Sequence, residues 1–260
     1  MDLQLRDKVA WVLGASSGLG RASAESLGRE GARVAVSARR AGALDEVVGA
    51  IGSSAVAVPL DVTDSAAIGT AAKEVVSRLG AIDILIVNAG GPRPGGFEAT
   101  GADELARGFD LTLASAWHLA KQVVPAMKER GRGCVIFITS SSTKEVIPSL
   151  LLSNMMRAAV VGMAKTMSKE LGPKGIRVLC VAPGRIETPR VVSLDENAAE
   201  ASGRGISEVR NESEARIPLG RYGQPREFGD VVAFLASERA SYVSGITVTV
   251  DGGALNGILS

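Results

Sequence analysis

The sequence predicts one α/β domain built on a doubly wound parallel sheet of seven strands, with helices on both faces. Through the first ninety residues, short apolar runs alternate with segments whose apolar residues recur at helical spacing. The runs show little polar alternation, which is typical of parallel strands covered on both faces. No internal repeat and no low-complexity linker interrupts the pattern. We therefore expect a single domain over residues 1–260.

Composition narrows the possible partners. The formal net charge of the 260 residues is +1, with acids and bases interspersed, so neither a nucleic acid nor a membrane is an expected partner. Charges flank the few apolar residues at the N-terminus, and no later apolar run approaches the roughly 20 residues of a membrane helix, which predicts a cytoplasmic protein. Cys134 and Cys180 fall in predicted strands without neighbouring His or Cys, which favours reduced core thiols and no metal site.

The first strand, turn and helix have the layout of a dinucleotide site. An apolar run, 9–13, enters a loop with glycines at 14, 18 and 20, and a helical segment follows as far as Gly31. Glycines allow close backbone approach, and the helix N-terminus offers unpaired N–H groups to a pyrophosphate. Because the spacing is Gly-x-x-x-Gly-x-Gly, an ordinary strand-to-helix turn is the alternative. The candidate pyrophosphate contacts are Gly14, Ser16, Ser17, Gly18, Leu19 and Gly20.

The second apolar run, 33–37, ends in polar residues where such a site meets the adenosine ribose. An NAD site usually places a carboxylate there, whereas this chain offers Ser37, Arg39 and Arg40. Paired guanidinium groups without an acid favour a 2′-phosphate, so we predict NADP(H) in preference to NAD(H). Two solvated arginines at a strand end are the alternative.

The rest of the chain continues the alternation of strands and helices. The predicted helices are 44–51, 68–79, 110–130, 151–171 and 225–236, and the predicted strands are 55–64, 82–87, 134–139, 177–182 and 247–250. Asp64 or Ser65 is the expected N-cap of the second of these helices. The lone His118 in a long helix is interpreted as a packing or surface residue. The polar, charged segment 191–216 is predicted to be a mobile substrate flap.

Polar residues follow the predicted strands at the carboxyl end of the sheet, where open α/β sheets bind ligands. Asp61, followed by Val62, is placed to meet an adenine amino group, with a turn role as the alternative. Asn88-Ala89-Gly90 opens the glycine- and proline-rich loop 90–96. We expect this loop to form one wall of the site.

Four motifs follow one another in order: Gly14-x-x-x-Gly18-x-Gly20, Asn88-Ala89-Gly90, Pro183-Gly184 with Thr188, and Asp251-Gly252-Gly253. Together they make the chain resemble the short-chain dehydrogenase/reductase family over essentially its full length. The resemblance implies a single Rossmann domain, a nicotinamide cofactor, and hydride transfer between a small carbonyl and an alcohol. It also implies a homodimer or homotetramer built on the two long helices. The further cofactor contacts that it implies are Asn88, Ala89, Gly90, Arg157, Pro183, Gly184, Ile186 and Thr188.

The catalytic positions depart from the family pattern. The family's serine matches Ser140, but its Tyr-x-x-x-Lys pair corresponds to Ser153 and Arg157, and its asparagine corresponds to Thr112. The chain therefore resembles a divergent subgroup close to the β-ketoacyl-acyl-carrier-protein reductases. A serine hydroxyl is a weaker acid and a shorter side chain than tyrosine, so Ser153 needs a water to reach a carbonyl. Losing a positioned acid typically costs about 10²–10⁴-fold in rate.

Lys144, which follows Ser140 by four residues, is a candidate replacement for the missing proton donor. A partly buried lysine beside Arg157 is expected to have a lowered pKa, which is the property of a proton donor near neutral pH. The alternatives are a water held by Ser140 and Ser153, or a lysine that is simply solvated.

Three functions remain open on the sequence. The leading one is an NADP(H)-dependent carbonyl reductase or alcohol dehydrogenase; the others are a catalytically inactive NADP(H)-binding sensor or partner subunit, and a fold that binds no nucleotide. Arginines in the predicted flap suit an anionic substrate group, or they are solvated charges. These arginines are Arg190, Arg204, Arg210 and Arg216.

Overall fold

The computed structural model describes residues 1–258 and contains the predicted sheet. Seven strands lie in the order β3-β2-β1-β4-β5-β6-β7, and every recorded pair of neighbours is parallel. The strands are β1 (Val9–Leu13), β2 (Arg33–Ser37), β3 (Ala55–Ala57), β4 (Ile84–Val87), β5 (Gly133–Ile138), β6 (Ile176–Pro183) and β7 (Thr247–Val250). The reversal of strand order beside β1 makes this a doubly wound sheet, whose carboxyl edge is the expected ligand side.

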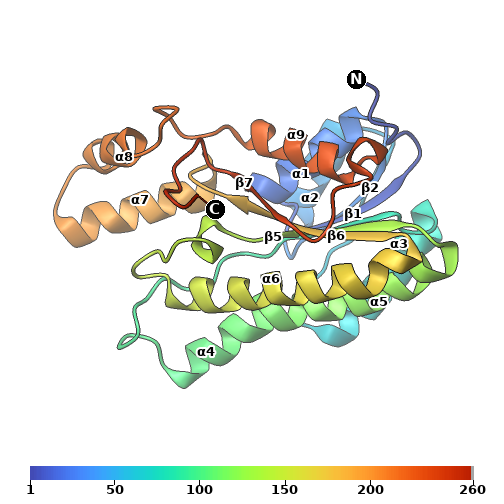
Figure 1. Ribbon diagram of the computed structural model, residues 1–260, viewed down its shortest axis with the longest axis horizontal. Helices are drawn as coiled ribbons and strands as arrows, with labels where there is room; N and C mark the ends of the chain where they lie inside the picture. Colours follow the sequence, from blue (N-terminus) through green and yellow to red (C-terminus); the bar gives the residue numbers. More distant parts are fainter. Residues whose placement is uncertain (259–260) are drawn as a thin grey trace.

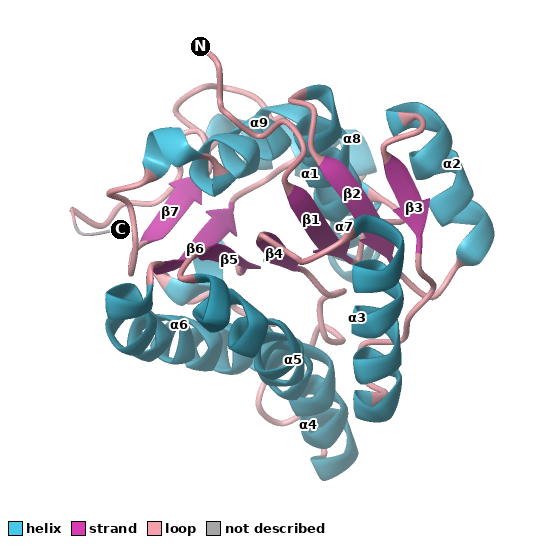
Figure 2. Ribbon diagram, turned by 90° about the vertical axis from the view of Figure 1, so that its right-hand side faces the viewer, coloured by secondary structure: helices cyan, strands magenta, loops and turns pink. Residues whose placement is uncertain are grey.

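Helices form a layer on each face of the sheet, as Figure 2 shows. The helices are α1 (Gly18–Arg29), α2 (Ala41–Ile51), α3 (Ser65–Leu79), α4 (Ala102–Phe109), α5 (Ser115–Arg130), α6 (Leu151–Leu171), α7 (Pro189–Ser202), α8 (Ile206–Ala215) and α9 (Pro225–Ala236). One layer contains α1, α2 and α9, and the other contains α3, α5 and α6 (Figure 2). None of the helices within residues 1–258 has the length and apolar character needed to cross a bilayer.

Each strand supplies alternate residues to two separate cores. In β1, Trp11 and Leu13 pack on the side of α3, α5 and α6, whereas Ala10 and Val12 pack on the side of α1, α2 and α9. Because successive side chains of a strand point to opposite faces, a strand covered on both faces must be apolar throughout. Cys134 and Cys180 are buried in these cores, and burial raises their pKa values to about 11 and about 12, so both thiols stay protonated.

The structure corrects several predicted boundaries. The third strand is only Ala55–Ala57, and the predicted helix 110–130 begins with a π-helical turn, η1 (Asp110–Ala114), that joins α4 to α5. Helix α4 has no counterpart in the prediction, because its eight residues are too few to show a helical period. The predicted flap 191–216 consists largely of α7 and α8, which stand out from the body of the molecule in Figure 1. Its mobility stays a prediction.

Arg177 in β6 ties the carboxyl end of α9 to the sheet. One guanidinium nitrogen donates to the carbonyls of Leu235 and Val243 at 2.7 and 3.3 Å, and the other to those of Ala236 and Ser237 at 3.1 and 3.0 Å. Helix ends leave carbonyl groups without intrahelical donors, and a single planar cation satisfies several of them here. Arg177 therefore fixes α9 against the amino-terminal half of β6.

Replacing this cation tests that role. Arg177→Met keeps a long apolar side chain but leaves the carbonyl groups unpaired, so we expect the free energy of unfolding in urea to fall by about 2–4 kcal/mol. Arg132→Met, whose side chain is 62% exposed, is the matched control and is expected to change stability by less than about 0.5 kcal/mol. Equal effects of the two substitutions would contradict the assigned role.

Candidate active site

The glycine loop between β1 and α1 is shaped by contacts that leave no room for side chains. Gly14 and Gly18 have φ values of 60° and 55°, in the left-handed region. A Cβ on Gly20 would lie 2.3 Å from the carbonyl oxygen of Gly14. The Asn88 amide donates to that same oxygen at 3.3 Å and supports the loop from β4. Ser16, Ser17 and Leu19 complete a loop that leads into the N-terminus of α1, and such a cradle fits a dinucleotide pyrophosphate.

The end of β2 places arginine beside the glycine loop. Arg40 Nη2 lies 3.4 Å from Ser16 Oγ, and the charge of Arg39 reaches Asp61, whose pKa it helps to lower. Within the described chain, no carboxylate forms an ion pair with Arg39 or Arg40. An unpaired cationic edge next to the glycine loop is the arrangement expected of a 2′-phosphate site.

Ser37 does not belong to that edge, and its expected contact with a cofactor is wrong. The residue is fully buried, and its hydroxyl accepts a hydrogen bond from Trp11 Nε1 at 2.9 Å. As the last residue of β2, it points to the same side of the sheet as Ala35, into the core. Its side chain is therefore used in packing.

Asp61 is exposed and makes a local turn. Its Oδ1 accepts from the backbone N–H and the hydroxyl of Thr63, at 3.0 and 2.8 Å. The backbone hydrogen bond is the main reason that the pKa of this carboxyl lies below its usual value. The turn role is thus observed, whereas an adenine contact of Asp61 or of the neighbouring Val62 stays a prediction.

The loop 90–96 is attached to the start of α6. Gly95 N–H donates to the Ser149 carbonyl at 2.6 Å, and Leu151 N–H donates to the Gly95 carbonyl at 3.1 Å. These bonds hold the far end of the loop that Asn88, Ala89 and Gly90 begin at the carboxyl end of β4. The predicted wall of the site therefore lies beside the first turn of α6.

The first two turns of α6 carry two of the predicted catalytic residues. Ser153 and Arg157 lie one helical turn apart, and each is only 9% exposed. The hydroxyl of Ser153 lies 3.5 Å from that of Ser142, which the sequence prediction missed in favour of Ser140. Ser140 instead accepts from the backbone N–H of Ser142 at 3.1 Å and caps a 3₁₀ turn, η2 (Ser141–Thr143). The run of three serines was the available signal, and the turn decides which one faces α6.

Arg157 is a buried cation that is hydrogen-bonded to the sheet. Its Nη1 donates to the Ile138 carbonyl at the end of β5, at 2.8 Å. Burial, together with the positive charge of Arg190, lowers the pKa of Arg157 to about 10. The side chain therefore remains protonated at neutral pH, and it holds or orients groups without exchanging protons.

Lys144 does not have the burial that the proton-donor hypothesis assumed. It follows the η2 turn and is exposed. The premise of a partly buried lysine is therefore wrong.

Thr112 lies in the η1 turn, which packs against α6. The residue is 6% exposed, and its hydroxyl has no hydrogen-bond partner in the described protein. A buried hydroxyl without a protein partner is uncommon, since leaving one unpaired costs about 1–3 kcal/mol. The turn thus holds one buried polar atom that no described protein group satisfies.

The loop after β6 closes the glycine loop from the other side. A Cβ on Gly18 would lie 3.3 Å from the methyl group of Thr188, and the Thr188 hydroxyl accepts from Val191 N–H at 3.4 Å as the N-cap of α7. Pro183 and Gly184 pack against Asp251, which a Cβ on Gly184 would approach to 2.6 Å. The Asp251-Gly252-Gly253 motif is therefore a structural support. Ile186 is buried against Gly223, so only its backbone is available to a cofactor.

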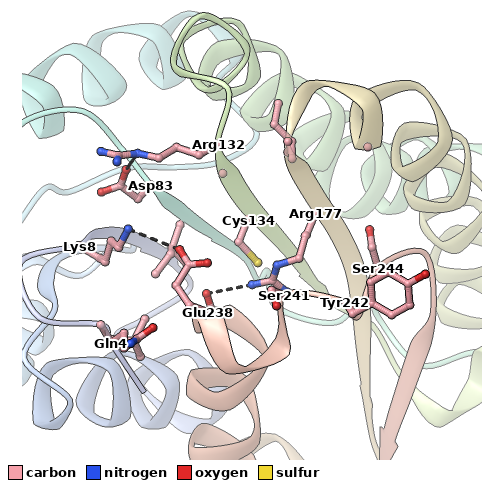
Figure 3. A pocket seen from close by; sticks show the side chains of 17 residues that line it. Gln4, Lys8, Asp83, Arg132, Cys134, Arg177, Glu238, Ser241, Tyr242 and Ser244 are labelled. Carbon is pink, nitrogen blue, oxygen red and sulfur yellow. Dashed lines mark hydrogen bonds and ion pairs between the residues drawn. The ribbon is translucent and has the colours of Figure 1, made fainter. Parts of the chain in front are cut away.

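A separate cavity of about 410 Å³ lies at the amino ends of the strands, on the edge opposite the glycine loop (Figure 3). Its charged side chains are paired: Lys8 lies 3.5 Å from Glu238, and Arg132 lies 3.7 Å from Asp83. Arg177, which also lines it, is bonded to backbone carbonyls. The cavity offers neither an unpaired charge nor a glycine cradle, so the carboxyl edge of the sheet is the candidate site.

Known proteins resemble this chain over nearly its whole length. The family model described as enoyl-(acyl carrier protein) reductase matches residues 14–254. The chain is 34% identical over 258 residues to the 3-oxoacyl-acyl-carrier-protein reductase FabG of Thermotoga maritima, covering 96% of this chain and 99% of the relative. It is 33% identical over 257 residues to the 7alpha-hydroxysteroid dehydrogenase of Escherichia coli, covering 98% and 96% respectively.

A solved structure agrees with these relatives. The L-sorbose reductase of Gluconobacter frateurii, complexed with NADPH and L-sorbose, superposes with a TM-score of 0.93 at 29% identity. The superposition covers 99% of this chain and 100% of the sorbose reductase. These proteins are named as reductases or dehydrogenases of different substrates. The comparisons therefore identify an oxidoreductase fold and leave the substrate of this chain open.

The orphan hydroxyl at the η1 turn gives a direct test of the site. Thr112→Val removes the hydroxyl while keeping its shape, so we expect stability to stay within about 1 kcal/mol or to rise, while NADPH-dependent turnover falls by about tenfold. Urea unfolding and steady-state rates are measured on the same preparation. Substantial destabilisation with unchanged turnover would show that the hydroxyl serves packing alone.

Proposed function

The chain belongs to the short-chain dehydrogenase/reductase family, and from that premise we propose that it is an NADP(H)-dependent oxidoreductase acting on a small carbonyl or alcohol substrate. The observation that carries the proposal is Arg40 beside Ser16, with Arg39 preceding it in the chain, next to a glycine loop in which a Cβ at Gly20 has no space. The cradle suits a pyrophosphate, and the two cations suit an extra phosphate on the ribose.

The chain's own residues take on binding and proton transfer. When bound, the nicotinamide supplies or accepts a hydride, and a carbonyl that receives it also needs one proton to become an alcohol. Ser153 and Ser142, whose hydroxyl oxygens lie 3.5 Å apart, hold a water that delivers this proton. Arg157 holds the nicotinamide ribose hydroxyls, as a fixed cation with several N–H donors. Orientation of the substrate supplies much of the acceleration that the missing tyrosine does not.

A catalytically inactive NADP(H)-binding sensor or partner subunit is the second candidate. It is favoured by the three departures at catalytic positions, Thr112, Ser153 and Arg157, beside an unaltered glycine loop. Such a protein binds NADPH but does not oxidise it with any carbonyl.

We also propose a homodimer or homotetramer assembled through the long helices. Large apolar side chains are exposed on the long helices α5 and α6 and on the neighbouring α4. Phe109 in α4 is 46% exposed, Trp117 in α5 is 48% exposed, and Met155 in α6 is 47% exposed. Burying such side chains against a second copy removes apolar surface from water. Sedimentation velocity measures the resulting mass.

The cofactor assignment is tested at the arginine edge. Arg39→Ala with Arg40→Ala removes two charge-assisted contacts, so we expect NADPH affinity to fall by about 100-fold or more while NADH affinity changes less than about threefold. Fluorescence titration measures both dissociation constants. The charge-matched control is Lys128→Ala with Lys174→Ala, at the opposite edge of the sheet, and it should leave both constants unchanged. A parallel loss of NADH affinity would mean that the arginines do not read the 2′-phosphate.

The proton route is tested by comparing two variants. Ser153→Ala removes one of the two hydroxyls that hold the water, so we expect kcat to fall by about 10–100-fold with NADPH affinity unchanged. Lys144→Ala is expected to leave kcat and its pH profile unaltered, because the lysine is exposed. The reverse ranking of the two variants would assign proton transfer to Lys144.

A further inference from the structure

The arginines of the α7 and α8 segment divide into two kinds. Three of them are paired with carboxylates near the surface: Arg204 lies 2.6 Å from Glu212, Arg210 lies 2.8 Å from Glu187, and Arg216 also pairs with Glu212. These ion pairs fold the segment onto itself and satisfy its charges. Three of the four arginines in and beside the predicted flap therefore have their charges satisfied within the protein.

Arg190 is the fourth and is placed differently. It is the second residue of α7, and its Nη2 donates to the Pro92 carbonyl at 3.0 Å, across the sheet edge from its own helix. The guanidinium covers Gly91, where an added Cβ would lie 3.1 Å from Nη2. Residues 91 and 92 belong to the loop 90–96, which is attached to the first turn of α6. Arg190 therefore links the start of α7 to the loop 90–96, the predicted wall of the site.

Arg190 and Arg157 together leave positive charge without a counter-ion. Among residues 1–258, no carboxylate lies within ion-pair distance of either guanidinium, and their recorded partners are the neutral carbonyls of Pro92 and Ile138. Desolvation lowers the pKa of both arginines, and the charge of Arg190 contributes to the effect on Arg157. Arg157 is buried, whereas Arg190 is exposed and open to a ligand. A buried cation without an acid, with a second unpaired cation beside it, indicates a place suited to an anion.

The cofactor accounts for only part of this charge. In the proposed function, Arg157 faces the ribose hydroxyls, which are neutral, the 2′-phosphate lies at Arg39 and Arg40, and the pyrophosphate lies at the glycine loop. The Arg190 guanidinium is instead at Gly91 and Pro92, in the loop 90–96 that is expected to form a wall of the substrate site. The anion that matches Arg190 is therefore carried by the substrate.

We propose that Arg190 is a specificity-determining residue that binds a carboxylate on the substrate, so that the natural substrates are oxo acids or hydroxy acids and not neutral ketones. A guanidinium presents two parallel N–H donors that match a carboxylate, and Arg190 uses only one recorded hydrogen bond within the protein. This inference rests on the proposed oxidoreductase function and names its substrate class.

Matched acids and esters test the inference. The probes are phenylpyruvate and 3-oxobutanoate, each beside its methyl ester, and their dissociation constants are measured by thermal shift on the protein saturated with NADP⁺. We expect at least one acid to bind about 10- to 100-fold more tightly than its ester. Arg190→Gln should remove that preference, Arg190→Lys should restore part of it, and Arg204→Gln should leave it unchanged.

The outcomes separate this inference from the proposed function. NADPH binding with no preference for the acid in either pair overturns the carboxylate site and leaves the reductase standing. A loss of NADPH affinity in Arg190→Gln also overturns it, because Arg190 is then a cofactor contact. If NADPH does not bind to the wild-type protein, the proposed function fails, and the acid preference of the free protein still decides the role of Arg190.

Discussion

The close approach of Gly20 to the carbonyl oxygen of Gly14, with the Asn88 amide bonded to the same oxygen, fixes the centre of the carboxyl edge. This contact joins β1, α1 and β4 at the point where the strand order reverses. Thr188 then packs on Gly18, so the start of α7 takes its position from the same loop. A side chain at Gly20 would displace these parts together, because its Cβ would meet the backbone of Gly14 and the amide nitrogen of Asn88 in a closely packed contact.

The chemistry of the edge is dominated by cations and hydroxyls. Where the family places a tyrosine and a lysine, this chain has Ser153, which lies near Ser142, and Arg157, which remains charged at neutral pH. These positions therefore hold a hydroxyl and a fixed positive charge. In the proposed mechanism, binding and orientation, supported by a water, carry more of the work than acid catalysis does. Arg190 adds a second cation beside the loop 90–96.

Much of the fold was predictable because buried parallel strands leave apolar runs that are hard to misread, such as Val9–Leu13. Helix α6 was predicted with its observed bounds, Leu151–Leu171, whereas the π-helical turn at Thr112 was not, since it depends on packing against α6. Ser37 was predicted to contact the cofactor because it lies at the polar end of its strand. The alternation of side chains along the strand instead turns it into the core, where it bonds to Trp11. The contact of Ser142 with Ser153 could not be predicted, nor could the contact of Arg190 with Pro92, which sets it apart from the three arginines paired with carboxylates. Both are tertiary contacts, which no local sequence pattern indicates.

A reductase that works without the tyrosine must both bind NADPH and oxidise it. Fluorescence titration of the purified protein with NADPH, continued in the same sample with ketones, β-ketoacyl thioesters and oxo acids, measures both steps. We expect saturable binding of NADPH followed by its oxidation with a carbonyl substrate. Absence of NADPH binding would contradict the NADP(H) site, and tight binding without oxidation across the panel would contradict the reductase and favour the sensor.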